Sequence, residues 1–400
     1  MYKIIHQGVD TLDVALAGTL PKQVIDELMV ARQLAETMHN DDHGVSVCLG
    51  PNKRKFFVKG QGKKGGYYFV IVDDPTGAIF SVKKNAQRPD WNFFVSARAA
   101  GLLSRSYEGM KRHIAESLTD IGAVITDVSV NRIDYAIDIA TPEFVLEMEN
   151  FIAPRKSKVG CYFTNGFDMD DLGNPVGKHD SEVVGSVMRG GRFESVTVGK
   201  MPGRQVTLYD KLQAAKDLKT DYWFPAWKID PRNPGTQVWR VELRAGKKGL
   251  ERYIRPPQKR NYETVDAVLP EMLCDAVRQI RYAYGGRNLG NVTRSEVHPL
   301  WLAAQEAVSD LPHDDVPALP PEYVLELMRK QRHAMAESQA FGNLNNMLVL
   351  EGYTEAEIQS SYARLAADRA LKYQDGLGKD LHRKKLDKTL DRLSIFVPTD

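Results

Sequence analysis

Residues 130–140 read VNRIDYAIDIA, and the alternation of side chains in this stretch predicts the strand around which the chain folds. Successive side chains of a strand point to opposite faces of a sheet. One face would hold Ile133, Tyr135, Ile137 and Ile139, and the other Arg132, Asp134, Ala136 and Asp138. Aspartate is disfavoured in sheets, so two aspartates on one strand indicate a functional surface; solvated acids on an ordinary strand are the alternative.

Two later segments show the same alternation, each with one strongly polar face. In QVTLYDK, residues 205–211, that face would carry Gln205, Thr207, Tyr209 and Lys211. In VWRVELR, residues 238–244, it would carry Arg240, Glu242 and Arg244. If both strands lie beside residues 130–140, the sheet brings together acids, cations and one tyrosine.

The rest of the pattern predicts an α+β protein. Short apolar runs separated by Gly, Pro and Asp indicate strands between residues 45 and 97, and helical spacing recurs after Pro21 and over residues 104–121, 142–152 and 262–284. The segment TLDVALAGTLPKQVIDELM resembles RIDYAIDIATPEFVLEMEN further along the chain. We therefore expect one antiparallel sheet built from two similar βα-β-β-β halves, with helices on one face.

Composition shifts suggest how the chain is divided. Residues 1–308 would form the sheet-containing domain, with halves at about 1–122 and 123–290. The proline- and acid-rich residues 309–321 predict a linker, and residues 322–400 a C-terminal helical region in which Thr354 and Glu357 form a capping box. Residues 165–192, rich in Gly and Asp, predict a long loop.

Composition also limits the class of protein. The formal net charge is +2, and Cys48, Cys161 and Cys274 form no CxxC pair, which indicates reduced, buried thiols. No apolar run reaches the ~20 residues that span a bilayer, and the first residues lack a signal-peptide pattern. We expect a cytoplasmic protein without membrane contact.

Positive charge is concentrated in two runs. The first contains no acid and comprises Lys53, Arg54, Lys55, Lys59, Lys63 and Lys64. The second, near the C-terminus, comprises Arg383, Lys384, Lys385, Lys388 and Arg392. Such runs are usually solvated faces, and nucleic-acid contact is the alternative.

Strand geometry constrains any metal site. Residues four apart in a strand are ~13 Å apart, so Asp134 and Asp138 cannot both bind one ion. A neighbouring strand lies only ~4.8 Å away, which makes Glu242 the best partner for either aspartate. Oxygen ligands suit Mg²⁺ or Mn²⁺. Arg240 and Arg244 would then hold phosphates in bidentate fashion, with Lys211 as a point charge.

Three segments, taken in order, resemble one family. RIDYAID, VTVGKMPGRQVTLYDK and WRVELR are together similar to replication initiation factors of the Rep_trans type, which serve rolling-circle plasmids and filamentous phages and include relaxases of mobile elements. The resemblance covers about residues 10–290. It implies a relaxase-like (HUH-like) fold, although the sequence contains no His-x-His motif.

The family resemblance implies a metal-assisted DNA strand transferase. Tyr209 would attack a phosphate of single-stranded DNA at an origin or nick site, leaving a 5′-phosphotyrosyl link and a free 3′-hydroxyl. The family's acids correspond to Asp134, Asp138 and Glu242, with Mg²⁺ or Mn²⁺ as the ion. Lys211 and Arg240 would assist catalysis. The DNA-binding residues would be Arg132, Arg244 and the first basic run: Lys53, Arg54, Lys55, Lys59, Lys63 and Lys64.

A free phenol has a pKa of about 10, so Tyr209 needs a neighbouring cation, ion or base to act as a nucleophile at neutral pH. The alternative for this residue is a half-buried structural tyrosine. Alternatives for the whole protein are a metal-dependent nuclease that uses water and a non-catalytic single-stranded-DNA-binding protein. The C-terminal helices would bind duplex origin DNA or a host helicase, or pack on the sheet.

Overall fold

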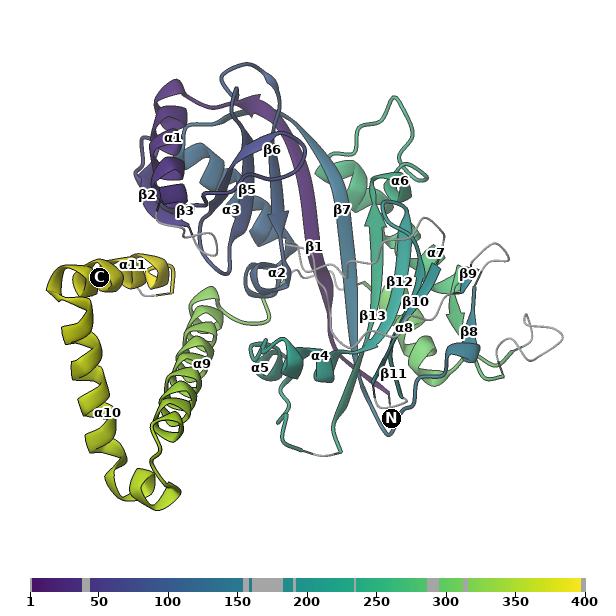
Figure 1. Cartoon of the computed structure of the whole chain (residues 1–400). Coiled ribbons are helices and arrows are strands. Elements are labelled where there is room, and N and C mark those ends of the chain that lie inside the picture. Colours follow the sequence, from purple (N-terminus) through teal and green to yellow (C-terminus); the bar gives the residue numbers. More distant parts are fainter. Residues whose placement is uncertain are drawn as a thin grey trace.

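The computed structural model describes residues 2–37, 44–153, 158–159, 183–189, 192–233, 235–285, 295–311 and 316–396. Its centre is a 12-stranded sheet in the order β2-β3-β4-β5-β6-β1-β7-β13-β12-β11-β10-β9 (Figure 1). The strands of this sheet are β1 (Lys3–Thr19), β2 (Val45–Leu49), β3 (Arg54–Val58), β4 (Tyr67–Val72), β5 (Ala78–Lys83), β6 (Asp90–Ala97), β7 (Val124–Thr141), β9 (Lys158–Val159), β10 (Val183–Arg189), β11 (Arg192–Gly199), β12 (Arg204–Asp210) and β13 (Gln237–Gly246). A separate two-stranded sheet pairs β8 (Phe151–Ile152) with β14 (Arg281–Tyr282).

Helices follow or interrupt the strands. In the sheet-containing part they are α1 (Lys22–Thr37), α2 (Ala99–Arg105), α3 (Tyr107–Asp120), α4 (Lys211–Asp217), α5 (Trp223–Trp227), α6 (Lys247–Leu250), α7 (Tyr262–Gln279) and α8 (Pro299–Ser309). The C-terminal part consists of α9 (Pro321–Leu350), α10 (Glu355–Leu377) and α11 (Lys379–Leu393).

The two longest strands lie side by side in the middle of the sheet. β1 and β7 pair antiparallel over nearly their whole lengths. After β1 the chain runs through β2 to β6, and β6 returns to the other edge of β1. After β7 it runs through β9 to β13, and β13 returns to the other edge of β7. The predicted mixed α+β fold with a large antiparallel sheet is thus present.

The helix predicted for residues 142–152 is wrong. The chain there forms a single 3-10 turn, Met148–Asn150, and then β8. Phe144 is buried against Trp239, with 4.8 Å between ring centres, and its backbone N–H donates to Gln237 Oε1 at 3.0 Å. These tertiary contacts hold the segment extended. The second half therefore lacks the helix that follows β1 in the first, and the proposed duplication stays a prediction.

Helices cover both faces of the sheet, so the prediction of one covered face is also wrong. The main core packs α1, α3, α7 and α8 against one face. A second apolar cluster packs α2, α4, α5 and the start of α9 against the other face, where Trp223 and Trp227 are almost fully buried. The sheet face that carries Asp134 and Asp138 is therefore an interior.

Several smaller predictions can be compared with the structure. The strand β10 falls inside the predicted loop of residues 165–192, whereas residues 165–182 and 190–191 lie outside the described part. The helix predicted for residues 262–284 ends at Gln279 because the chain then enters β14. Cys48 is exposed, contrary to the expectation of a buried thiol, and Cys161 is not among the described residues. None of the described helices is long and apolar enough to span a membrane.

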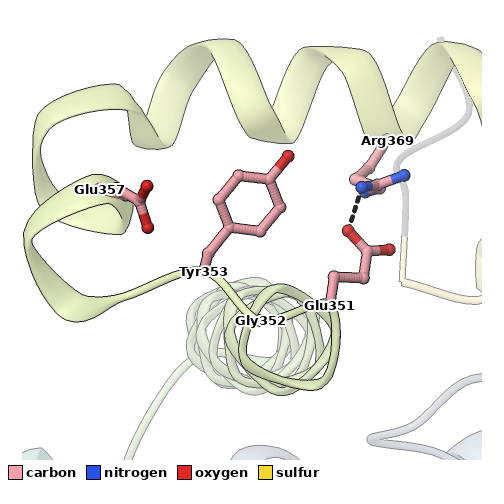
Figure 2. Close-up of a pocket in the computed structure, with 5 residues that line it drawn as sticks. All are labelled: Glu351, Gly352, Tyr353, Glu357 and Arg369. Atoms are coloured by element: carbon pink, nitrogen blue, oxygen red, sulfur yellow. Dashed lines mark hydrogen bonds and ion pairs between the residues drawn. The ribbon is translucent and has the colours of Figure 1, made fainter.

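The C-terminal helices form an arm that extends away from the sheet and returns to it (Figure 1). The predicted capping box opens α10, since Glu357 N–H donates to Thr354 Oγ1 and Thr354 N–H to Glu357. A hollow of about 490 Å³ lies between the end of α9 and α10, where Arg369 pairs with Glu351 (Figure 2). Arg369 and Glu351 in this hollow pair with each other, and Glu357 belongs to the capping box of α10. The hollow lies far from the sheet (Figure 1).

Gly246 at the end of β13 provides a test of how tightly this region packs. A Cβ at Gly246 would lie 2.5 Å from the Pro202 carbonyl oxygen. We expect Gly246→Ala to lower the free energy of unfolding by about 1–3 kcal/mol, measured as a lower urea midpoint. Gly8→Ala in β1 is the control, because nothing lies within 4 Å of its added Cβ. Equal midpoints for the two variants would contradict the close approach.

Candidate active site

Three neighbouring strands place Tyr209, Arg240 and Asp138 in one row. Tyr209 of β12 is paired with Arg240 of β13, which is paired with Asp138 of β7. Directly paired residues project from the same face of a sheet. Residues two apart on a strand also share a face, so Tyr209 lies on the side that carries Asp134 and Glu242.

The next rows carry the other predicted site residues. Glu242 is paired with Ala136 on β7 and with Thr207 on β12, and Arg244 with Asp134. Glu242 is therefore a diagonal neighbour of both aspartates, at about 7–8 Å in sheet geometry. The sheet brings these residues together as the alternation predicts.

The Arg240 guanidinium is fully occupied by protein groups. Its Nε and Nη2 donate to the two carboxylate oxygens of Asp138, at 2.5 Å and 2.8 Å, and its Nη1 donates to Asp10 at 2.6 Å. Trp227 Nε1–H donates to Asp138 at 2.8 Å, and the Trp223 ring centre lies 4.3 Å from the guanidinium carbon. Burial opposes ionisation of Asp138, but Arg240 outweighs it and lowers the carboxyl pKa.

The burial of Arg240 corrects its predicted role. Both Arg240 and Asp138 have 0% exposed side chains, so Arg240 cannot hold a phosphate in the bidentate fashion predicted for it. The arginines closer to solvent are Arg132 and Arg244, with side chains 15% and 18% exposed. Of the three arginines on this face, these two retain some exposure to solvent.

Arg132 and Arg244 each pair with a buried acid on their own strand. Arg132 Nη2 lies 2.6 Å from Asp134, and Arg244 Nε lies 2.8 Å from Glu242. Burial and the Glu242 charge raise the pKa of Asp134 to about 7, despite Arg132. Burial also opposes ionisation of Glu242, but Arg244 and Arg240 outweigh it and lower its pKa to about 2. Glu242 is therefore ionised at neutral pH, whereas Asp134 titrates there.

Lys211 occupies a different element from the one predicted. β12 ends at Asp210, whose carboxylate caps α4 by accepting from Gln213 N–H at 2.9 Å, and Lys211 is the first residue of that helix. Lys211 nevertheless stays close to Tyr209: its Nζ lies 5.8 Å from the Tyr209 ring centre and 4.7 Å from that of Trp223.

Burial shifts the pKa values of Lys211 and Tyr209 in opposite directions. Burial, reinforced by Arg240, lowers the pKa of Lys211 to about 8. Burial raises the pKa of Tyr209 well above 10, and Arg240 only partly offsets this. Tyr209, which remains partly exposed, is therefore a neutral phenol beside an amine that can lose its proton near neutral pH.

The predicted acids are not arranged as a metal site. Asp134, Asp138 and Glu242 suit Mg²⁺ or Mn²⁺ as oxygen donors, but an arginine neutralises each of them. Within the described ranges, they are not part of any set of three or more histidine, cysteine, aspartate or glutamate side chains whose donor atoms all lie within 4.8 Å of one another. As arranged, these residues do not fit a divalent cation.

Such a set exists in the first half of the chain, where donor atoms of Asp73, Asp74 and His113 lie within 4.8 Å of one another. Asp73 accepts from Ala78 N–H and lies 2.5 Å from His113 Nε2, while Asp74 accepts from Thr76 N–H and from Arg105. These contacts fasten the turn between β4 and β5 to α2 and α3. We regard the group as a structural turn.

The first basic run is not brought to the tyrosine. Lys53, Arg54, Lys55 and Lys59 lie on or next to β3, seven strand spacings from β12, or about 34 Å, whereas Lys63 and Lys64 precede β4. Arg54 pairs with Asp120 at 2.8 Å and Lys53 with Glu27 at 3.7 Å. Lys63 Nζ lies 4.6 Å from the Phe94 ring centre.

Sequence reasoning missed four residues of this site: Asp10, His6, Trp223 and Trp227. His6 is paired with Asp138 across β1 and β7, and burial lowers its pKa. Asp10 lies at a register shift between Val9 and Thr11, where an extra residue changes the direction of its side chain. Simple alternation cannot predict such a bulge. The aromatic run YWF at residues 222–224 was a signal for the covering helix.

Comparisons with known proteins give limited information. No protein-family model matches the sequence, and the comparison with curated proteins finds no match. Among solved structures, a rolling circle replication initiator protein from Geobacillus stearothermophilus is similar, at 14% sequence identity and a TM-score of 0.39. The match covers 79% of this chain and 99% of that chain. A TM-score of 0.39 establishes no common fold, so the site is judged on its own geometry.

The buried ion pair can be tested by removing one or both partners. Arg240→Met leaves Asp138 buried without its main counter-charge, and we expect a loss of about 3–5 kcal/mol in the free energy of unfolding. Arg240→Met combined with Asp138→Leu removes both charges and should restore most of that loss. Urea unfolding measures both. A double variant no more stable than Arg240→Met alone would contradict a coupled pair.

Proposed function

We propose that this protein nicks and rejoins single-stranded DNA, with Tyr209 as the nucleophile. The observation that carries the proposal is that the partly exposed Tyr209 shares one sheet face with Arg132 and Arg244 and lies beside Lys211. A phosphodiester held by the two arginines would meet a phenol with a proton acceptor next to it. The family resemblance of these three strands points to the same chemistry.

The reaction exchanges one phosphate ester for another. The Tyr209 oxygen forms a bond to phosphorus while the bond from phosphorus to the 3′-oxygen breaks. The product is a 5′-phosphotyrosyl link and a 3′-hydroxyl, which receives the proton that the phenol loses. The reverse attack by a 3′-hydroxyl rejoins the strand, so no external energy source is required.

In this proposal, the residues around Tyr209 have three separate roles: proton transfer, stabilisation of the phenolate and binding of the phosphate. Because its pKa is lowered, part of Lys211 is a neutral amine, and this form accepts the proton of the Tyr209 phenol. Arg240, held between Asp138 and Asp10, places a fixed positive charge near the phenolate as it forms. Arg132 and Arg244 bind the phosphate oxygens and offset the charge that develops on them.

Other expectations rest on the family resemblance alone. Mg²⁺ or Mn²⁺ stays a prediction, and no step is assigned to it because arginines neutralise the three predicted ligands. Initiation of rolling-circle replication, a relaxase role in a mobile element and a host helicase partner likewise stay predictions. Assays with and without Mn²⁺ measure whether an ion is required.

A covalent adduct tests the nucleophile. Wild-type protein incubated with labelled single-stranded oligonucleotides should form a DNA adduct stable to denaturing electrophoresis, and Tyr209→Phe should form none. Tyr135→Phe is the matched control, because Tyr135 projects from the opposite face into the main core. Cleavage without an adduct would instead indicate a nuclease that uses water. Binding without cleavage would indicate a non-catalytic single-strand-binding protein.

The pH dependence tests Lys211. The neutral amine is the active form, so the rate of adduct formation should rise with pH and level off above about 8. Lys211→Arg keeps the charge but cannot accept the proton, and it should slow the reaction by about 10²–10⁴-fold and abolish the inflection. A variant that retains the inflection near pH 8 would exclude Lys211 as the acceptor.

A further inference from the structure

Residues 316–328, which we call the strap, lead from the proline-rich segment into the first turns of α9. Val324 of the strap is 0% exposed and belongs to the apolar cluster that contains Trp223 and Trp227 of α5. Leu319, which precedes α9, packs against the same cluster. The C-terminal arm is therefore anchored on the cluster that covers the candidate site.

A backbone hydrogen bond fastens the strap to α2. Ala318 N–H donates to the Leu103 carbonyl oxygen at 2.9 Å, and α2 also contacts α9. A cavity of about 40 Å³ lies at this contact, and its lining includes Ala318, Leu103, Trp223 and Asp10. Asp10 is one of the two carboxylates that hold Arg240. The strap thus lies across one small cavity from groups of the candidate site.

Trp223 and Trp227 connect the cluster to the charged groups of the site. Trp227 Nε1–H donates to Asp138 at 2.8 Å. The Trp223 ring centre lies 4.3 Å from the Arg240 guanidinium carbon and 4.7 Å from Lys211 Nζ. If α5 moved away from the sheet, water would therefore reach Lys211 and Arg240 together.

The helix α5 is too short to hold this position by itself. It comprises five residues, and a helix of that length gains little stability from its own hydrogen bonds. Beyond residues 222–227, the buried members of the cluster are Leu212, Ala215, Val238, Ala100, Leu103 and Val324. Of these, Val324 belongs to the C-terminal arm, so the arm supplies part of the packing that positions α5.

We propose that the strap holds α5 against the sheet and keeps Lys211 and Arg240 enclosed, so that displacement of the C-terminal arm slows the reaction at Tyr209. Val324 acts through Trp223 and is a positioning residue. The effect on the reaction rests on the proposed function, whereas the packing of the strap on the α5 cluster does not.

Entry of water would change the charge state of Lys211. Burial, reinforced by Arg240, lowers the pKa of Lys211 to about 8, whereas a lysine in water has a pKa of about 10.4. The titratable or charged groups that surround Lys211 are His6, Asp10, Asp138, Tyr209, Arg240 and Glu242. None of these six belongs to the strap, so the strap acts on Lys211 by excluding water.

Hydrogen exchange of the full-length protein tests the enclosure without DNA. Val324→Ser should raise the exchange rate of amides in α4 and α5 by about 10-fold, because these helices would open more often. Leu348→Ser is the matched control and should leave those rates unchanged, because Leu348 is equally buried in α9 but is not a member of this cluster.

A second, milder variant guards against a general failure to fold. Ala318→Pro removes the N–H that donates to Leu103 but keeps the buried apolar side chains of the strap, and it should raise the same exchange rates. Wild-type exchange in α4 and α5 of both strap variants would overturn the proposal.

The pH profile of adduct formation separates positioning from loss of stability. In Val324→Ser, we expect the inflection near pH 8 to rise by about one unit, because water reaches Lys211. The rate at pH 7 should then fall about 10-fold, since the neutral amine becomes ten times rarer, and it should recover above about pH 9.5.

An equal loss of rate at every pH would indicate destabilisation alone and would overturn the proposal. If the wild-type protein forms no adduct, the proposed function fails, but faster exchange of α4 and α5 in Val324→Ser would still support the strap.

Discussion

The ion pair between Arg240 and Asp138 is the interaction on which the candidate site depends. Removing two charges from water is costly, and the cost is tolerable only when their hydrogen-bonding groups are satisfied. Asp10 and Trp227 complete the hydrogen bonds, and Trp223 packs on the guanidinium. The pair therefore joins β1, β7, β13 and α5 and fixes the positive charge beside Tyr209.

Charge in this site is arranged in two layers. Arg240 is enclosed and pairs with the two carboxylates of Asp138 and Asp10, whereas Arg132 and Arg244 are partly exposed and each pairs with one buried acid. A phosphate that binds the outer arginines would displace no buried charge. The buried guanidinium stabilises the packing of this face, and the proposed function assigns phosphate binding to the two partly exposed ones.

Much of the fold could be predicted because alternating apolar and polar residues indicate a strand with one buried face. Residues 130–140, 205–210 and 238–244 form neighbouring strands, and their polar residues share one face. The helix assigned to residues 142–152 was wrong because Phe144 packs on Trp239, and Asp10 was missed because β1 bulges there. Both departures arise from contacts distant in sequence, which a local pattern does not contain.

The sequence by itself determined which side chains share a face, because the direction of side chains along a strand follows from backbone geometry alone. Only the tertiary structure decided that this face is an interior: α4 and α5 fold over it and bury Asp138 and Arg240 completely. It also decided that Ile395 and Phe396, which follow α11, pack against Phe57 of β3, far away in the sequence. Burial and long-range contact depend on how elements pack, and they set the pKa values and charge pairing from which chemistry follows.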